Sequence, residues 1–179
     1  MGVKRSVYNA LGGFSRMRFG EDIDFSIRIF KGGYKCRLFP DAWVWHKRRT
    51  DMDKFFRQVF NSGIARINLM KRHPGSLKLV HLLPAAFTVG VILLLVLSLI
   101  LRFLGSWIWI YTLLPIEIYC LLLFIDSSVK NKSMSIGILS VEAAFVQLFG
   151  YGFGFIKAWW QRCVLNKGEF SAYEKNFYD

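Results

Sequence analysis

The sequence predicts an α/β head followed by an all-α membrane region of two or three transmembrane helices. Two observations lead to this fold class. The first 81 of the 179 residues carry 17 Lys/Arg and six Asp/Glu, and a helical pattern there is followed by an aromatic, strand-like stretch. The remaining residues carry seven Lys/Arg and six Asp/Glu and hold long apolar runs. A basic head is therefore joined to an apolar, nearly neutral tail, which excludes an ordinary soluble domain.

Residues 1–50 form the first part of the basic head. A helix is expected there from Glu21 to about Phe30. Apolar residues recur along it at i, i+4 and i+7 and share one face. Asp24 and Arg28 stand four residues apart and can form an ion pair. Gly32-Gly33 ends the helix. Residues 34–46 are rich in aromatic residues and predict a strand.

Residues 51–81 predict a basic amphipathic helix at the membrane interface. Its apolar face is made by Met52, Phe55, Phe56, Val59, Phe60, Ile64 and Ile67. The basic side chains lie mostly on the opposite face. A helix of this kind that leads into a membrane span is most simply interfacial.

Residues 82–156 predict the membrane region. The candidate helices are 82–101, 106–125 and 133–156. The first holds 20 residues without a charge, and a bilayer core of about 30 Å takes about 20 helical residues. Glu142, Gln147 and several glycines interrupt the third, so two and three crossings both stay open. A polar, basic tail over 157–179 follows.

Three of the 12 acids, Glu21, Asp22 and Asp24, stand together where the first helix begins. One explanation is structural, because each acid in a first turn gains about 0.3–1 kcal/mol from the helix dipole. The other is catalytic: one carboxylate takes a proton from an acceptor hydroxyl while its neighbour holds that hydroxyl. Basic surroundings would keep the carboxylate ionised and attract phosphates. The acids alone leave both explanations open.

Three short motifs carry a family resemblance. GGF (12–14), GED (20–22) and WVWH (43–46), in this order and spacing, resemble the C-terminal part of the GT-A domain of a membrane-bound family 2 glycosyltransferase. The resemblance implies an inverting transferase that uses a nucleotide-sugar donor and a divalent metal ion, Mn²⁺ or Mg²⁺. In such enzymes the metal is held mainly by a DxD motif in an N-terminal nucleotide-binding half. That half and its motif are absent here, so a fragment inactive on its own is expected.

The same resemblance implies roles for single residues. Asp22 is expected to be the catalytic base, and Glu21 is expected to contact the acceptor. Gly12 and Gly13 would shape the acceptor side of the sugar pocket. His46 would help to ligate the metal ion.

The segment RQVFNSGIAR (57–66) lies where membrane-bound family members carry an interfacial helix with Gln and Arg. The resemblance implies substrate contacts for Arg57, Gln58 and Arg66. It is not a QxxRW match, because no Trp follows Arg66, so processive and single transfer both stay open.

The expected function is transfer of a sugar to a membrane-associated saccharide or lipid-linked acceptor in cell-envelope or exopolysaccharide synthesis. The expected partners are the donor, the acceptor and membrane lipids, without nucleic acid. The expected location is the plasma or inner membrane, with a cytoplasmic head. Two alternatives stay open: a non-catalytic membrane-docking or assembly module, and a small transporter or channel subunit with Glu117 and Glu142 as intramembrane acids.

Overall fold

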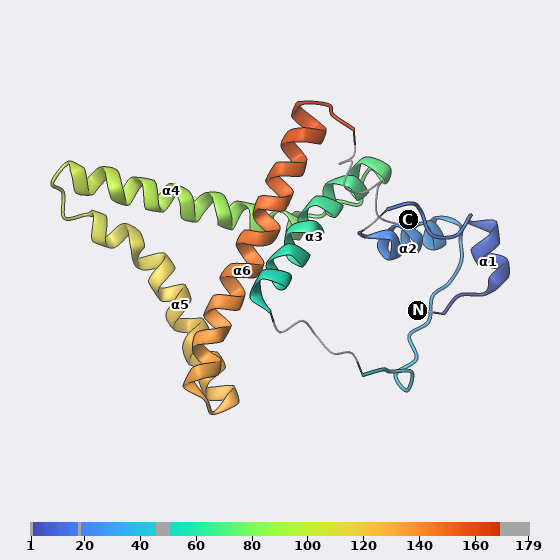
Figure 1. Cartoon of the computed structure of the whole chain (residues 1–179), viewed down its shortest axis with the longest axis horizontal. Coiled ribbons are helices and arrows are strands. Elements are labelled where there is room, and N and C mark those ends of the chain that lie inside the picture. The colour runs from blue at the N-terminus through green and yellow to red at the C-terminus, as the bar shows by residue number, and fades with distance from the viewer. Residues whose placement is uncertain (1, 18, 46–50, 169–179) are drawn as a thin grey trace.

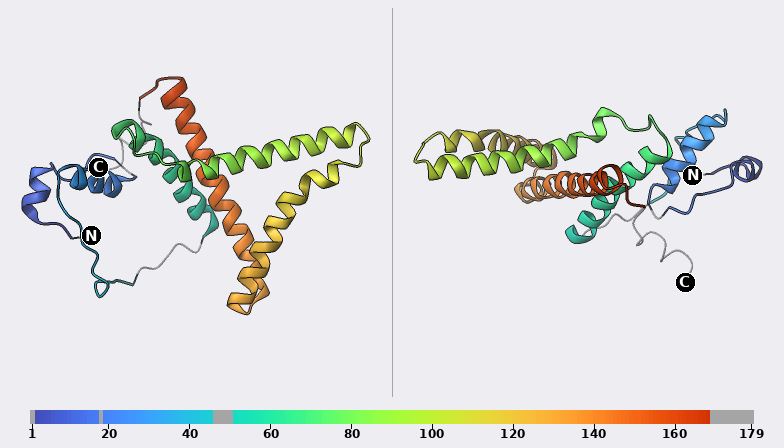
Figure 2. Two further views of the ribbon diagram at one scale, coloured as in Figure 1. Left: turned by 180° about the vertical axis from the view of Figure 1, so that it is seen from behind. Right: turned by 90° about the horizontal axis from the view of Figure 1, so that it is seen from above.

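The computed structural model describes residues 2–17, 19–45 and 51–168, and every regular element in these ranges is helical. The elements are α1 (Arg5–Ala10), α2 (Glu21–Lys31), α3 (Met52–Arg72), η1 (Leu79–His81), α4 (Leu83–Phe103), α5 (Trp109–Asn131), α6 (Met134–Trp159) and η2 (Trp160–Val164). The element η1 is a 3-10 turn, and η2 is a π-helical turn that continues α6. Figures 1 and 2 place α1 and α2 at one end of the molecule, α4 and α5 at the other, and α3 and α6 between them.

The α/β fold class predicted for the head is wrong, because the described part of the head contains helices and loops but no strand. The sequence predicts a strand over 34–46, yet residues 34–45 are irregular and exposed throughout. Within 35–45 the backbone hydrogen bond that the structure shows joins the Ala42 N–H to the Phe39 carbonyl, at 3.1 Å, and is local. A strand requires a neighbour that pairs with its N–H and C=O groups, and no described segment provides one.

The helix predicted to begin at Glu21 is present as α2. It follows Gly20, whose φ of 84° lies in the left-handed region, and it ends at Gly32. Its apolar face packs against aromatic residues of the preceding segment. The Phe25 ring lies 5.7 Å from the Tyr8 ring and 4.9 Å from the Phe14 ring, measured between centroids.

The amphipathic helix within 51–81 is present as α3. Its N-cap is Asp51, whose carboxylate accepts hydrogen bonds from the backbone N–H groups of Asp53 and Lys54 at 2.9 and 3.2 Å. The helix ends before His73, and Pro74 follows, which cannot continue a helix. The interfacial placement of α3 stays a prediction.

Among the described residues, three helices are long and apolar enough to cross a membrane: Leu83–Phe103, Trp109–Asn131 and Met134–Val164. Each lies over one of the three candidate segments. Hydroxyl groups link them, as is common between membrane helices. The Thr88 hydroxyl of α4 donates to the Leu148 carbonyl of α6 at 3.3 Å, and the Ser127 and Ser140 hydroxyls join α5 to α6 at 2.5 Å.

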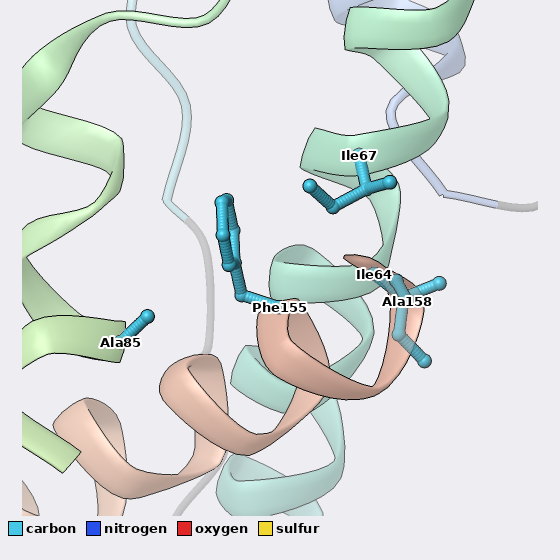
Figure 3. Packing of buried hydrophobic residues seen from close by; sticks show 5 residues of the cluster. All are labelled: Ile64, Ile67, Ala85, Phe155 and Ala158. Atoms are coloured by element: carbon cyan, nitrogen blue, oxygen red, sulfur yellow. The ribbon is translucent and has the colours of Figure 1, made fainter. Parts of the chain in front are cut away.

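The main hydrophobic core lies between α3 and α6, which run side by side (Figure 1). Figure 3 shows Ile64 and Ile67 of α3 beside Phe155 and Ala158 of α6, with Ala85 of α4 at the edge. All five side chains are buried. The core therefore joins the amphipathic helix to the membrane region and gives α3 a protein surface to pack against.

Glycines let α3 and α6 approach closely. A Cβ atom on Gly150 would lie 2.5 Å from Cγ2 of Val59, and one on Gly154 would lie 2.8 Å from the Phe60 carbonyl carbon. Gly63 is the reciprocal glycine on α3. Small residues spaced four apart allow such close contact between helix backbones. The glycines that interrupt the third candidate segment therefore form a packing surface.

Candidate functional site

The loop between α1 and α2 is built around two glycines. Gly12 and Gly13 have φ values of 73° and 69°, which favour glycine. A Cβ atom on Gly13 would also lie 2.6 Å from the Tyr8 ring. Arg28 of α2 then fixes this loop, because its guanidinium donates to the carbonyl oxygens of Leu11 and Gly13 at 2.6 and 2.7 Å.

Arg28 is held in turn by Asp24, which is buried. The guanidinium Nε and Nη2 atoms of Arg28 both lie 2.9 Å from Oδ2 of Asp24, so the predicted i, i+4 pair is confirmed. The second oxygen, Oδ1, lies 2.7 Å from Nε2 of His73. Burial acts to raise the pKa of Asp24, but side-chain hydrogen bonds, with that from His73 foremost, and the Arg28 charge outweigh it and lower the pKa.

The other two acids remain open to a pocket. Glu21 is half-buried and Asp22 is exposed in the first turn of α2. They border a pocket of about 410 Å³ that is also lined by Tyr8, Phe14, Ser15, Arg16 and Met17. The three clustered acids thus divide into one buried structural carboxylate and two accessible ones.

The GED motif also rests on α3. A Cβ atom on Gly20 would lie 3.3 Å from Cδ1 of Leu69 and 3.5 Å from Cβ of Ala65. Both this close contact and the positive φ of Gly20 favour glycine at this position. The glycine that directly precedes Glu21 and Asp22 therefore lies against α3.

The structure does not bring the predicted basic contacts of α3 to this pocket. Arg57 and Gln58 are exposed on the first half of α3, away from the residues that touch Gly20. Arg66 is half-buried near His81 of η1. Burial, followed by the nearby charges of Arg66 and Lys78, lowers the pKa of His81.

A metal site does not assemble from the described residues: no three His, Cys, Asp or Glu side chains converge there. Glu21 and Asp22 are adjacent carboxylates, but no third metal-binding side chain among the described residues joins them. Asp24 is instead bonded to Arg28 and His73. His46, the predicted ligand, lies outside the described residues. Its role stays a prediction.

His73 is the site residue that sequence reasoning missed. It lies 49 positions from Asp24, and no local spacing connects the two. The sequence suggests only a membrane-proximal histidine next to Pro74. A tertiary contact of this kind leaves no periodic trace in one sequence.

Comparison with known proteins identifies the family of the chain. Residues 1–125 match Glycosyl transferase family group 2, and because this is well over half of the chain, the chain belongs to that family of glycosyltransferases. It is also 32% identical over 56 residues to the probable glycosyltransferase YdaM of Bacillus subtilis (strain 168). That alignment spans 31% of this chain but only 13% of the length of YdaM. No solved structure matches the chain significantly.

Proposed function

We propose that the protein is an inverting glycosyltransferase that moves a sugar from a nucleotide-sugar donor to a membrane-associated saccharide or lipid-linked acceptor. The observation that carries the proposal is the contrast between Asp22 and Asp24. Asp24 is 3% exposed and is held by Arg28 and His73. Asp22 is exposed and borders the pocket, so its carboxylate is free to accept a proton.

The reaction is a single displacement. The acceptor hydroxyl gives its proton to the Asp22 carboxylate, and the acceptor oxygen forms a bond to the anomeric carbon of the donor. On the opposite side, the bond from that carbon to the phosphate oxygen breaks, and its electron pair leaves with the nucleoside diphosphate. One such displacement inverts the anomeric centre. A positioned general base contributes about 10²–10⁴ in rate.

The neighbours of Asp22 suit the two substrates. Glu21 borders the same pocket and can accept a hydrogen bond from the acceptor, which would hold the hydroxyl in line. Arg16, also in the pocket, supplies a positive charge toward the donor diphosphate. Gly12 and Gly13 shape the loop that carries the aromatic wall of the pocket.

Members of this family commonly use a divalent metal ion, and we include Mn²⁺ or Mg²⁺ in the proposal. His46 is the proposed ligand from this chain. When bound, the ion would neutralise charge on the diphosphate leaving group. Titrating Mn²⁺ against activity should give a higher half-saturation concentration for His46→Ala than for wild type, and an unchanged curve would remove His46 from the site.

The position of Gly20 against α3 supports a membrane-borne acceptor. Gly20 lies against α3, and the chain continues from α3 into three helices long and apolar enough to cross a membrane. Arg57, Gln58 and Arg66 are proposed as contacts for an acceptor that extends along α3. We place the head on the cytoplasmic side of the plasma or inner membrane, where nucleotide sugars are available.

The test uses the complete gene product in membranes, incubated with labelled UDP- and GDP-sugars and a lipid extract. The proposal predicts a labelled lipid-linked or saccharide product from one of these donors. NMR of the new linkage should show the anomeric configuration opposite to that of the donor. A product with retained configuration would rule out the single displacement, and no transfer from any donor would contradict the proposed activity.

One observation favours transport as a second candidate. A groove of about 640 Å³ between α5 and α6 is bordered by Glu117 and Glu142 within otherwise apolar surroundings. Ionisable groups within membrane helices are costly and often functional. Proton or cation flux in proteoliposomes that Glu117→Gln and Glu142→Gln abolish would support this candidate, and absence of flux would exclude it.

A further inference from the structure

We propose that His73 is a positioning residue for sugar transfer, which holds the carboxylate-bearing helix α2 on the C-terminal end of α3. The inference rests on the proposed function, because it assigns His73 to the reaction of Asp22. It adds a residue from outside the three motifs that suggest the site.

The contacts of His73 join two helices that are far apart in sequence. His73 is 8% exposed and caps the C-terminus of α3, where its backbone N–H donates to the Leu69 carbonyl at 2.7 Å. Its Nε2 lies 2.7 Å from Oδ1 of Asp24, and its Nδ1 lies 3.3 Å from Nζ of Lys31. Asp24 and Lys31 lie near opposite ends of α2. One imidazole thus contacts both ends of α2 from a fixed point on α3.

The two partners determine where the ring carries its proton. A lysine ammonium group has donors only, so Nδ1 of His73 must accept from Lys31. Asp24 is ionised and only accepts, so Nε2 must carry the hydrogen and donate. Both ring nitrogens are then satisfied in the neutral Nε2–H tautomer. A hydrophobic replacement would leave Oδ1 of the buried Asp24 carboxylate without its partner, which is costly.

A continuous path of hydrogen bonds connects His73 with the pocket. Asp24 links His73 to Arg28, and Arg28 holds the carbonyls of Leu11 and Gly13. Asp24 also stands two residues after Asp22, in the same turn of α2. A shift of Asp24 therefore moves both the base and the loop beside it. A displacement of about 1 Å of a reacting group can reduce turnover about 100-fold.

The activity test compares two substitutions in the complete gene product. His73→Leu removes the donor and should lower kcat about 10- to 100-fold while leaving the KM for the donor sugar nearly unchanged. His73→Gln keeps an N–H donor where Nε2 lies and should recover most of that loss. His81→Leu, in η1 and away from α2, is the matched control and should keep wild-type kcat. Full kcat in His73→Leu, or no recovery in His73→Gln, would overturn the proposal.

A second measurement is independent of activity and of the folding of the leucine variant. In protein labelled with ¹⁵N-histidine, the signal that disappears in His73→Gln should show an unprotonated Nδ1 and a protonated Nε2. The opposite tautomer would contradict the link to Asp24 and Lys31. Wild-type turnover in Asp22→Asn would instead remove the assigned base while leaving this NMR result standing, so the two failures are distinguishable.

Discussion

Replacing Gly63 by alanine tests the close packing of α3 on α6. A Cβ atom at this position would lie 2.7 Å from the Phe155 backbone nitrogen and closer still to the Tyr151 carbonyl oxygen, whereas ordinary contact begins at 3.4 Å. Both of these are backbone atoms, so a change of side-chain rotamer cannot relieve the clash. The helices must therefore separate locally by about 0.7 Å or more, which weakens the dispersion contacts of the core.

The expected cost is about 1–3 kcal/mol, the usual range for an overpacked core, and nearer the upper value because backbone opposes backbone. At about 2–4 °C per kcal/mol for a chain of this size, the upper value lowers the melting temperature by about 6–12 °C. Thermal unfolding in detergent, followed by circular dichroism, measures it. Because α3 also supports Gly20, transfer activity should fall with stability.

Gly90→Ala in α4 is the matched control. No atom lies within 4 Å of a Cβ atom at this helical position, so there is no clash. Alanine is favoured over glycine inside a helix by about 0.5–1 kcal/mol, and the control should be neutral or slightly stabilising. Equal melting temperatures for Gly63→Ala and Gly90→Ala would refute the close approach of α3 and α6.

Three further predictions concern the head and the topology. In urea unfolding, Arg28→Met should destabilise the protein more than Lys54→Met. Arg28 binds a buried carboxylate and two backbone carbonyls, whereas the exposed ion pair of Lys54 with Asp51 contributes under about 1 kcal/mol. Equal effects of the two substitutions would contradict this. Because the pKa of Asp24 is lowered by folding, its ionised carboxylate stabilises the fold at pH values above its ordinary pKa of 3.8, and this stability is lost as pH falls through the lowered pKa. Stability measured by unfolding from pH 5 to pH 2 should therefore decline less for Asp24→Asn than for wild type, and parallel declines would refute this. Residues 150–158 of α6 pack along α3, so the end of α6 should lie on the same side of the membrane as the head. Gly168→Cys in a cysteine-free background should therefore resist an impermeant thiol reagent on intact cells, whereas labelling from outside would place the end of α6 across the membrane from the head.

Local patterns made some features of this chain predictable. Three apolar runs are helices, the glycines after α2 end it, and the spacing of Asp24 and Arg28 forms the expected ion pair. Each of these depends on residues within one or two turns of one another. Sequence periodicity therefore describes them well.

Features that depend on distant partners were not predictable. The aromatic stretch over 34–46 has strand propensity, but a strand also requires a neighbour, and residues 34–45 have none among the described residues. Gly150 and Gly154 suggest an interrupted membrane segment, whereas they are the positions where α3 approaches α6. The contact of His73 with Asp24 depends on how α3 packs against α2, which no local pattern encodes.

The proposed role of Asp22 as the base of a sugar transfer is tested by one paired measurement on Asp22→Asn. Turnover and nucleotide-sugar binding are measured on the same preparation of the complete gene product. Asp126→Asn, an exposed aspartate paired with Lys130 at the far end of α5, is the matched control. If Asp22 is the base, turnover should fall about 10²–10⁴-fold in Asp22→Asn, with donor binding nearly intact and the control like wild type. Near wild-type turnover in Asp22→Asn would contradict it.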